Sequence, residues 1–328
     1  MRPPVLELRD VTKRFGSPRK PVWALTGLSF TVRAGETLGI VGESGSGKST
    51  LARIVVGLEK PTSGEVLING NSKLSHINLA SPIQMVFQDP TSSLDPLLPI
   101  FDSVREPLAG NRSLSSEERN SRVIRALQEV GLGSEIVFRY PNELSGGQKQ
   151  RASLARAIVS LPPMIVCDEA VTALDVSIRA QVLNLLRTIQ AQHNTAFIFI
   201  SHDLCTVSYM SDRIIVMYLG AVMEMGEREQ LFSTPAHPYT HSLLSAVPAL
   251  QQGPGARLRM RLKGDPPSVM NMPPGCRFQT RCPLADLRCR QEQPELRQIA
   301  DGHYAACHYA PVSAHVLEAA TNRAESTA

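Results

Sequence analysis

The segment at residues 42–50, GESGSGKST, carries the most specific chemistry in this chain. It matches the pattern G-x-x-x-x-G-K-[ST], in which backbone N–H groups surround phosphate oxygens. Lys48 adds a positive charge for the β- and γ-phosphates, and Ser49 offers a hydroxyl ligand to Mg²⁺. A helix that starts here directs its positive end at the same anion. The predicted binding residues for a nucleoside triphosphate and Mg²⁺ are Gly42, Glu43, Ser44, Gly45, Ser46, Gly47, Lys48, Ser49 and Thr50.

Two acidic residues, Asp168 and Glu169, end the apolar run MIVCDEA at residues 164–170. At the end of a buried strand, one carboxylate can hold Mg²⁺ while the next polarises an attacking water molecule. An Asp-Glu pair also occurs in ordinary exposed turns, so this pair indicates chemistry only together with the phosphate loop. The combination predicts hydrolysis of the triphosphate, with Asp168 as a Mg²⁺ ligand and Glu169 as the general base.

A second glycine-rich segment, ELSGGQKQR at residues 143–151, lies between the phosphate loop and the acidic strand. A helix that begins at these glycines forms another anion site. LSGGQ is the signature of the ABC ATPases, and the chain resembles that family in both the letters and the position of the segment. The resemblance implies that ATP is bound between two ATPase subunits. It also implies that the γ-phosphate of the opposing subunit's ATP is contacted by Ser145, Gly146, Gly147 and Gln148.

Further segments resemble this family in the same order along the chain. Gln88, in MVFQDP, is similar to the residue that senses Mg²⁺ and water and contacts the membrane subunits. Asp175, at the end of the segment ALD at residues 173–175, resembles the loop that crosses the dimer interface. His202, in FISHD, resembles the histidine that contacts the γ-phosphate and holds the attacking water beside Glu169. Phe15, in VTKRFG, resembles the aromatic that stacks on adenine, with core packing as the alternative.

The elements between these motifs predict an α/β fold. Apolar runs at residues 37–41, 164–170 and 196–203 are typical of buried parallel strands, and alternation of strands with helices indicates a sheet covered on both faces. Further predicted elements are strands at 5–9 and 64–70, helices at 49–58 and 179–193, a helix capped by Ser115 and Glu118, and a hairpin at 213–226. The resemblance implies a P-loop NTPase core with a RecA-like parallel sheet, a small antiparallel β subdomain, and a helical subdomain at about residues 89–160. We expect this nucleotide-binding domain to span residues 1–247.

Residues 248–312 form a second predicted unit, a C-terminal extension that is followed by a flexible tail at 313–328. The segments PAHPYTHSLLSAVP, from residue 235, and GCRFQTRCPLADLRCRQEQPEL, from residue 275, carry a further resemblance. They are similar to the extension of ATPase subunits from oligopeptide, dipeptide and nickel importers. This similarity is the most informative feature for the class of solute.

Four cysteines in the extension have the spacing C-x5-C-x6-C-x17-C, without the close pairs of most zinc sites. Four thiolates on irregular loops suit a [4Fe–4S] cluster. The family resemblance implies such a cluster at Cys276, Cys282, Cys289 and Cys307. Its negative charge would be offset by Arg277, Arg281, Arg288 and Arg290. Two alternatives stay open, namely buried free thiols, or zinc bound together with His303 or His308.

The composition of the chain limits its partners. The net charge of +4 is too small to indicate nucleic acid, and the basic run at residues 256–263 suits either solvent or an anionic surface. No apolar run reaches the ~18 residues of a spanning helix, so a role in transport needs membrane partners. The resemblance implies two transmembrane permease subunits, a second and diverged ATPase subunit, and an extracytoplasmic solute-binding protein. It places this chain at the cytoplasmic face of the membrane, with no nucleic acid as a partner.

The predicted function is ATP hydrolysis that powers an importer, most specifically one for dipeptides and oligopeptides, with nickel or another small solute as further options. The main alternative is a non-transport ABC ATPase of translation or DNA repair. Translation members usually carry two cassettes, and DNA-repair members carry long coiled coils, whereas this chain has one set of motifs and no long heptad run between Lys48 and Ser145. The predicted catalytic residues are Lys48, Gln88, Glu169 and His202.

Overall fold

The computed structural model describes residues 4–320 apart from 18–19, 72–81, 112, 173, 248–263, 266 and 318. Its N-terminal part contains a 3-stranded antiparallel sheet of order β2–β1–β4. The strands are β1 (Pro4–Ser17), β2 (Lys20–Arg33) and β4 (Ser63–Ile68). The strand predicted at residues 5–9 is confirmed, because the alternating apolar residues Leu6 and Leu8 face the core and are buried.

The main sheet has 8 strands in the order β10–β11–β9–β8–β3–β7–β6–β5. Its parallel part consists of β3 (Thr37–Val41), β5 (Ile83–Val86), β6 (Met164–Asp168), β7 (Ala196–Ile200) and β8 (Arg213–Tyr218). Every residue of β3 and β7 is buried, as their continuous apolar runs predict for a sheet covered on both faces. The carboxyl ends of these parallel strands meet at one edge, and a site formed there can draw on several strands.

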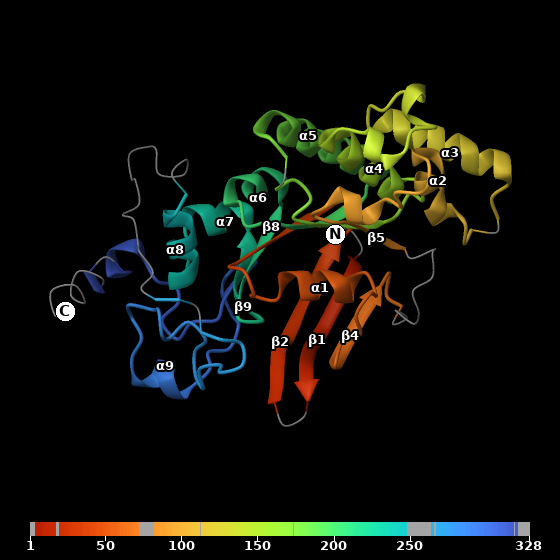
Figure 1. The fold of residues 1–328 in the computed structure, drawn as a ribbon. Helices are drawn as coiled ribbons and strands as arrows, with labels where there is room; N and C mark the ends of the chain where they lie inside the picture. The colour runs from red at the N-terminus through yellow and green to blue at the C-terminus, as the bar shows by residue number, and fades with distance from the viewer. Residues whose placement is uncertain are drawn as a thin grey trace.

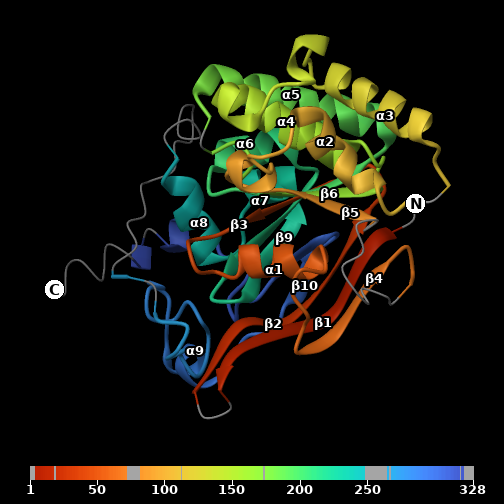
Figure 2. The same cartoon turned by 45° about the vertical axis from the view of Figure 1, so that its right-hand side comes forward.

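Helices and the smaller sheet cover the two faces of the main sheet. In Figures 1 and 2, α1 (Lys48–Val55) lies between the two sheets. On the opposite face lie α2 (Ile100–Arg105), α3 (Ser116–Glu129), α4 (Gly146–Ile158), α5 (Val176–His193) and α6 (Leu204–Met210). Each face has its own hydrophobic core, which is the layered arrangement expected of an α/β fold.

The stretch that was expected to be helical, at about residues 89–160, contains α2, α3, α4 and four short 3₁₀ helices. These are η1 (Pro90–Ser93), η2 (Glu106–Leu108), η3 (Ser134–Ile136) and η4 (Pro141–Glu143). The predicted capping box of α3 is confirmed: the Glu118 N–H donates to Ser115 Oγ at 3.1 Å, and the Ser115 N–H donates to Glu118 Oε2 at 2.7 Å. The predicted hairpin is also confirmed as β8 and β9 (Ala221–Glu227), which pair antiparallel.

The C-terminal extension continues the main sheet. It follows α7 (Arg228–Ser233) and α8 (Pro238–Ser245), and it contains α9 (Leu287–Gln291), β10 (Arg297–Ala300) and β11 (His303–Ala305). Strand β11 pairs with β9, and Cys276, Phe278 and Cys289 belong to the core beneath α2–α6. The expectation of a small, separate cysteine-containing module is therefore not supported, because backbone pairing and shared core residues join the extension to the ATPase-like sheet.

Some features predicted from the sequence lie outside the described residues. They are the basic run at 256–263, residue 173 of the ALD segment, and residues 321–328 of the expected tail. Within the described part of the chain, no helix combines the length and the apolar character needed to cross a membrane.

Candidate functional site

The phosphate loop connects β3 to α1, which is the context that the motif requires. Three of its glycines have left-handed backbone angles, with φ of 152° at Gly42, 76° at Gly45 and 101° at Gly47. A side chain at Gly47 would also place its Cβ 2.5 Å from the carbonyl oxygen of Ala24. Only glycine fits this tight path, which leaves backbone N–H groups free to surround an anion.

Lys48 lies almost fully buried inside the loop, with 7% of its surface exposed. Its Nζ donates to the carbonyl oxygens of Gly42 and Glu43, both at 2.8 Å. Burial lowers the pKa of Lys48, and the nearby carboxylates of Glu169, Asp168 and Glu43 act in the opposite direction. The backbone carbonyl oxygens of the loop therefore hold the Lys48 ammonium inside it.

Asp168, at the end of β6, faces Ser49 at the start of α1. The Ser49 hydroxyl donates to Asp168 Oδ1 at 3.4 Å. Burial raises the pKa of Asp168, and the Ser49 hydrogen bond and the charge of Lys48 oppose that shift. A carboxylate and a hydroxyl placed together beside a phosphate loop are oxygen ligands suited to Mg²⁺, so this pair fits the cation that the motif implies.

Glu169 and His202 come together at the ends of the adjacent strands β6 and β7. His202 Nδ1 lies 3.3 Å from Glu169 Oε1, and the His202 side chain is 65% exposed. Glu169 has a left-handed φ of 51°, and its N–H donates to the Ile200 carbonyl oxygen at 3.0 Å. A strained, non-glycine backbone at a strand end is typical of residues whose side chain must be aimed. The arrangement can polarise a water molecule and hold it beside a phosphate.

The signature residues lie at the start of α4. Ser145 caps the helix: the Gln148 N–H donates to its Oγ at 3.3 Å, and the Ser145 N–H donates to Gln148 Oε1 at 3.0 Å. A Cβ added at Gly146 would meet no heavy atom within 4 Å, so this helix start is open. Helices α4 and α1 lie on opposite sides of the main sheet (Figures 1 and 2). The fold therefore separates the signature from the phosphate loop within one chain.

Three other predicted residues have distinct surroundings. Asp175 caps α5, where it accepts from the Ile178 N–H at 2.9 Å. Gln88 is exposed and lies two positions after the end of β5. Phe15 is 40% exposed, and Lys13 Nζ lies 4.9 Å from its ring centre. That exposure disfavours core packing as the role of Phe15 and leaves its ring able to stack on a flat ligand.

The predicted iron–sulfur cluster gains no support from the geometry. The described residues include no group of three or more His, Cys, Asp or Glu side chains arranged to hold a metal ion. Burial raises the pKa of Cys276 to about 11 and that of Cys282 to about 12. His303 Nε2 contacts Glu224 at 2.7 Å, and His308 Nε2 contacts the Glu292 carbonyl oxygen at 3.0 Å.

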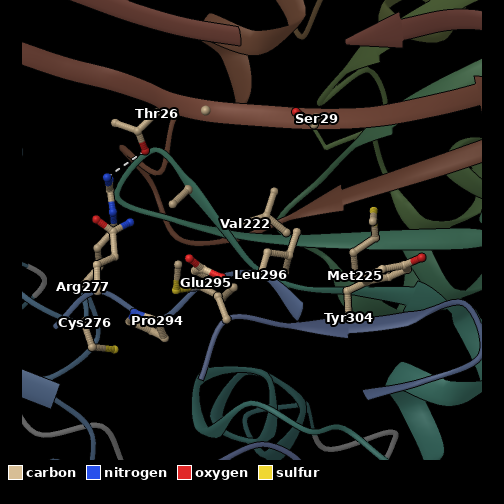
Figure 3. Close-up of a pocket in the computed structure, with 15 residues that line it drawn as sticks. Thr26, Ser29, Val222, Met225, Cys276, Arg277, Pro294, Glu295, Leu296 and Tyr304 are labelled. Atoms are coloured by element: carbon tan, nitrogen blue, oxygen red, sulfur yellow. Dashed lines mark hydrogen bonds between the residues drawn. The ribbon is translucent and has the colours of Figure 1, made fainter. Parts of the chain in front are cut away.

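Two arginines that were expected to offset a cluster instead contact the rest of the molecule. Arg281 Nη1 donates to Glu43 Oε2 of the phosphate loop at 2.7 Å. Arg277 donates to Thr26 Oγ1 of β2 at 2.7 Å, beside a cleft of about 630 Å³ (Figure 3). The Glu43 N–H also donates to the hydroxyl of Tyr239 at 2.9 Å. No role was predicted for Tyr239 itself, although its segment PAHPYT at residues 235–240 contributed to the family resemblance.

Comparisons with known proteins match both the N-terminal and the C-terminal part of the chain. Residues 25–172 match the family described as ABC transporter, and residues 223–289 match the oligopeptide/dipeptide transporter C-terminal region. The oligopeptide transport ATP-binding protein AppF of Bacillus subtilis is 46% identical over 318 residues, covering 93% of this chain and 97% of that protein. The di/tripeptide transport ATP-binding protein DppF of Pseudomonas aeruginosa is 47% identical over 317 residues, covering 93% and 98%.

Solved structures show the same fold. The cassette MJ0796, in a dimeric post-hydrolysis state bound to ADP and Pi, matches with a TM-score of 0.61 and 31% identity over 68% of this chain and 98% of that one. CbiO1 from Clostridium perfringens, part of the ABC transporter complex cbiONQ, matches with a TM-score of 0.62 and 28% identity over 70% and 91%. Since both curated relatives exceed 45% identity over nearly their whole length, this chain belongs to the ATP-binding proteins of the oligopeptide/dipeptide ABC transporter family.

Proposed function

We propose that this chain is the ATP-hydrolysing subunit of an importer for dipeptides and longer peptides. The observation that carries the proposal is the edge of the main sheet where Asp168 meets Ser49 and Glu169 meets His202, beside the phosphate loop. The class of solute rests on the relatives, whose names specify oligopeptide, di/tripeptide and dipeptide transport. Nickel or another small solute would be carried by the same ATPase chemistry, because other subunits contact the solute.

In the proposed mechanism of ATP hydrolysis, the residues of the site have different roles. The Lys48 ammonium and the backbone N–H groups of residues 42–50, other than those of Glu43 and Ser46, bind the β- and γ-phosphates. Ser49, Asp168 and Gln88 would hold Mg²⁺, which would neutralise charge on those phosphates. Glu169 accepts a hydrogen bond from the attacking water and polarises it. His202 keeps the Glu169 carboxylate in place and contacts the γ-phosphate. Phe15 stacks on the adenine.

A complete site needs a second ATPase subunit. The signature start of α4 lies across the main sheet from α1, so Ser145, Gly146, Gly147 and Gln148 are proposed to bind the γ-phosphate held by the opposing subunit. Asp175 would lie at that interface. The dimeric state of MJ0796 supports such an arrangement. We propose that the opposing subunit is a diverged sister ATPase, and that closure around ATP followed by hydrolysis moves the partners.

The partners follow from the family. We propose two transmembrane permease subunits, to which the chain attaches at the cytoplasmic face of the membrane, and an extracytoplasmic binding protein that delivers the peptide. Gln88, exposed after β5, is the proposed link between the ATP site and the permeases. No nucleic-acid partner is proposed.

We propose separately a [4Fe–4S] cluster at Cys276, Cys282, Cys289 and Cys307. It is supported by the number of thiols and by their mutual electrostatic influence, since the pKa of Cys282 is raised chiefly by burial and further by the other three cysteines. Iron and acid-labile sulfide should be counted after purification without oxygen. About four of each per chain would support the cluster, and their absence in a folded, active protein would establish free thiols.

The proposed function is tested by purifying the tagged chain from detergent-solubilised membranes and identifying its companions by mass spectrometry. Two polytopic permeases and a sister ATPase would support the importer, and the genetically linked binding protein would then identify the peptide. Ribosomal or DNA-repair proteins without a membrane subunit would overturn it in favour of a non-transport ABC ATPase.

A further inference from the structure

The phosphate-loop residue Glu43 is held at both ends by residues that follow β9 in the chain. Its backbone N–H donates to the Tyr239 hydroxyl at 2.9 Å. Its carboxylate accepts from Arg281 Nη1 at 2.7 Å. Tyr239 lies in α8, and Arg281 lies in the loop before α9, so two separate segments of the C-terminal region meet at one loop residue.

Both contacts are made from buried positions. Tyr239 is 0% exposed, and its ring centre lies 4.8 Å from that of Tyr218 and 5.3 Å from that of Phe278. The Arg281 side chain is 7% exposed and that of Glu43 is 26% exposed. A charge pair anchored by packed aromatic rings loses little further side-chain entropy, unlike the mobile ion pairs of a protein surface. The contact therefore constrains Glu43 within the folded state.

Arg277 strengthens this connection from the other side of the loop. Arg277 is 6% exposed, and its guanidinium donates to the carbonyl oxygen of Leu219, in the β8–β9 turn. It also donates to Thr26 Oγ1 (Figure 3). The next residue of that turn, Gly220, donates its N–H to the Ser46 carbonyl oxygen at 2.9 Å. Residues 277–281 thus reach the phosphate loop directly at Glu43 and through one turn at Ser46.

We propose that Tyr239 of α8 and Arg281 of the C-terminal extension are positioning residues for ATP, which hold the first part of the phosphate loop in its anion-binding shape and so set the affinity for ATP. The inference rests on ATP binding at this loop. Donors that are already aimed at phosphate cost no ordering free energy when ATP binds, whereas a loop released at Glu43 must be ordered by the ligand.

The test is the Kd of Mg·ATPγS for the purified full-length chain, measured by calorimetry for Arg281→Met, Glu43→Gln and the double variant. If Arg281 positions Glu43, each single change should raise Kd about three- to tenfold. The double change should add little, because each single change already removes the same Arg281–Glu43 ion pair. If Arg281 acted only through its charge on the phosphates, Glu43→Gln would tighten binding and the two effects would add. That result would overturn the proposal.

Three controls separate positioning from stability. Arg281→Lys keeps a cation and should restore Kd to within about twofold. Tyr239→Phe keeps the buried ring and removes only the hydroxyl, so it tests the positioning role even if Arg281→Met folds poorly. Arg288→Met changes an exposed arginine of the same extension, which is 58% exposed, and should leave Kd unchanged.

The outcomes also distinguish the two proposals. A wild-type chain that failed to bind Mg·ATPγS would overturn the proposed ATPase function. Wild-type binding together with unchanged Kd in Arg281→Met and Tyr239→Phe, whatever their melting temperatures, would overturn the positioning role alone.

Discussion

A buried carboxylate in the ATP site and one where β9 meets the C-terminal extension differ in how many hydrogen bonds they accept. In the ATP site, Asp168 has one hydroxyl donor, and burial raises its pKa, so its charged form is only partly satisfied by the protein. Where the extension joins the sheet, the carboxylate of Glu224 in β9 is 0% exposed and accepts from the Ala236 N–H at 2.8 Å, the His237 N–H at 2.9 Å and His303 of the extension at 2.7 Å. One carboxylate can still bind a ligand, whereas the other is occupied within the fold.

The difference separates function from stability along one sheet. At the carboxyl ends of β6 and β7, Asp168 has one hydroxyl donor and Glu169 contacts the exposed His202, so these side chains can still bind Mg²⁺, water and phosphate. The hydrogen bonds that Glu224 of β9 accepts, one of them from His303 of β11, hold the extension against the sheet. Changes in the first region should therefore reduce turnover with little loss of stability, and changes in the second should do the reverse.

The largest expected effect is in the ATP site. His202→Ala removes the side chain that contacts Glu169 at 3.3 Å, so ATP turnover should fall about 10²- to 10³-fold. Because the His202 side chain is 65% exposed, the urea midpoint of unfolding should stay close to that of wild type. A folded His202→Ala variant with normal turnover would contradict the catalytic role of the residues at the ends of β6 and β7.

The next largest effect is a loss of stability where β9 meets the extension. Glu224→Gln turns an acceptor of three hydrogen bonds into a group that presents an amide donor to other donors. The free energy of unfolding should fall by about 3 kcal/mol, measured by urea denaturation. Glu229→Gln is the matched control, since Glu229 is 87% exposed and its loss should have little effect. Equal stability of the two variants would contradict the structural role of Glu224.

A pH dependence should come from His237, next to Glu224. Burial lowers the pKa of His237 to about 4, against the nearby Glu224 charge, which raises it, while His241 lowers it further. Between about pH 6.5 and 4 the unfolded state then binds more protons, so stability is full above pH 6.5 and falls as the pH drops. From pH 7 to pH 5 the loss should be about 2 kcal/mol. His237→Asn, which keeps an acceptor for the Tyr239 N–H, should flatten this dependence; an unchanged slope would assign it to other groups.

The smallest expected effect concerns Ser145, which both stabilises the fold as a helix cap and is proposed to bind phosphate. Ser145→Ala removes the N-cap of α4 and should lower stability by about 1 kcal/mol. Ser145→Asp keeps a capping oxygen, so stability should hold, but its charge would face the opposing subunit's γ-phosphate, and turnover in the assembled transporter should fall at least about tenfold. Normal turnover of Ser145→Asp would argue against the signature contact.

Much of the ATP site could be predicted because its signals are local. The run TLGIV followed by glycines and Lys48 specifies strand, loop and helix within a few residues. The capping box at Ser115 and the hairpin ending at β9 have equally local patterns. Strand β5 was not predicted, since its 4 residues are too few to show a period.

The extension could not be predicted to the same depth because its contacts join distant residues. Ala305 pairs with Glu224 across 81 positions of sequence, and Arg281 reaches Glu43 across 238. No local pattern distinguishes an arginine that offsets a cysteine cluster from one that holds a phosphate loop. The cysteines themselves suggested a cofactor by number and spacing, and the geometry around them did not support it.

The central claim is that this chain hydrolyses ATP with Glu169 as the base, and it is tested most directly by comparing ATP binding with ATP turnover in Glu169→Gln. The substitution keeps the shape and hydrogen bonding of the side chain but removes the carboxylate that polarises water. If Glu169 is the base, turnover should fall by at least about 10²-fold. The Kd for Mg·ATP should stay within about twofold of wild type. Wild-type turnover in this variant would contradict this role of Glu169.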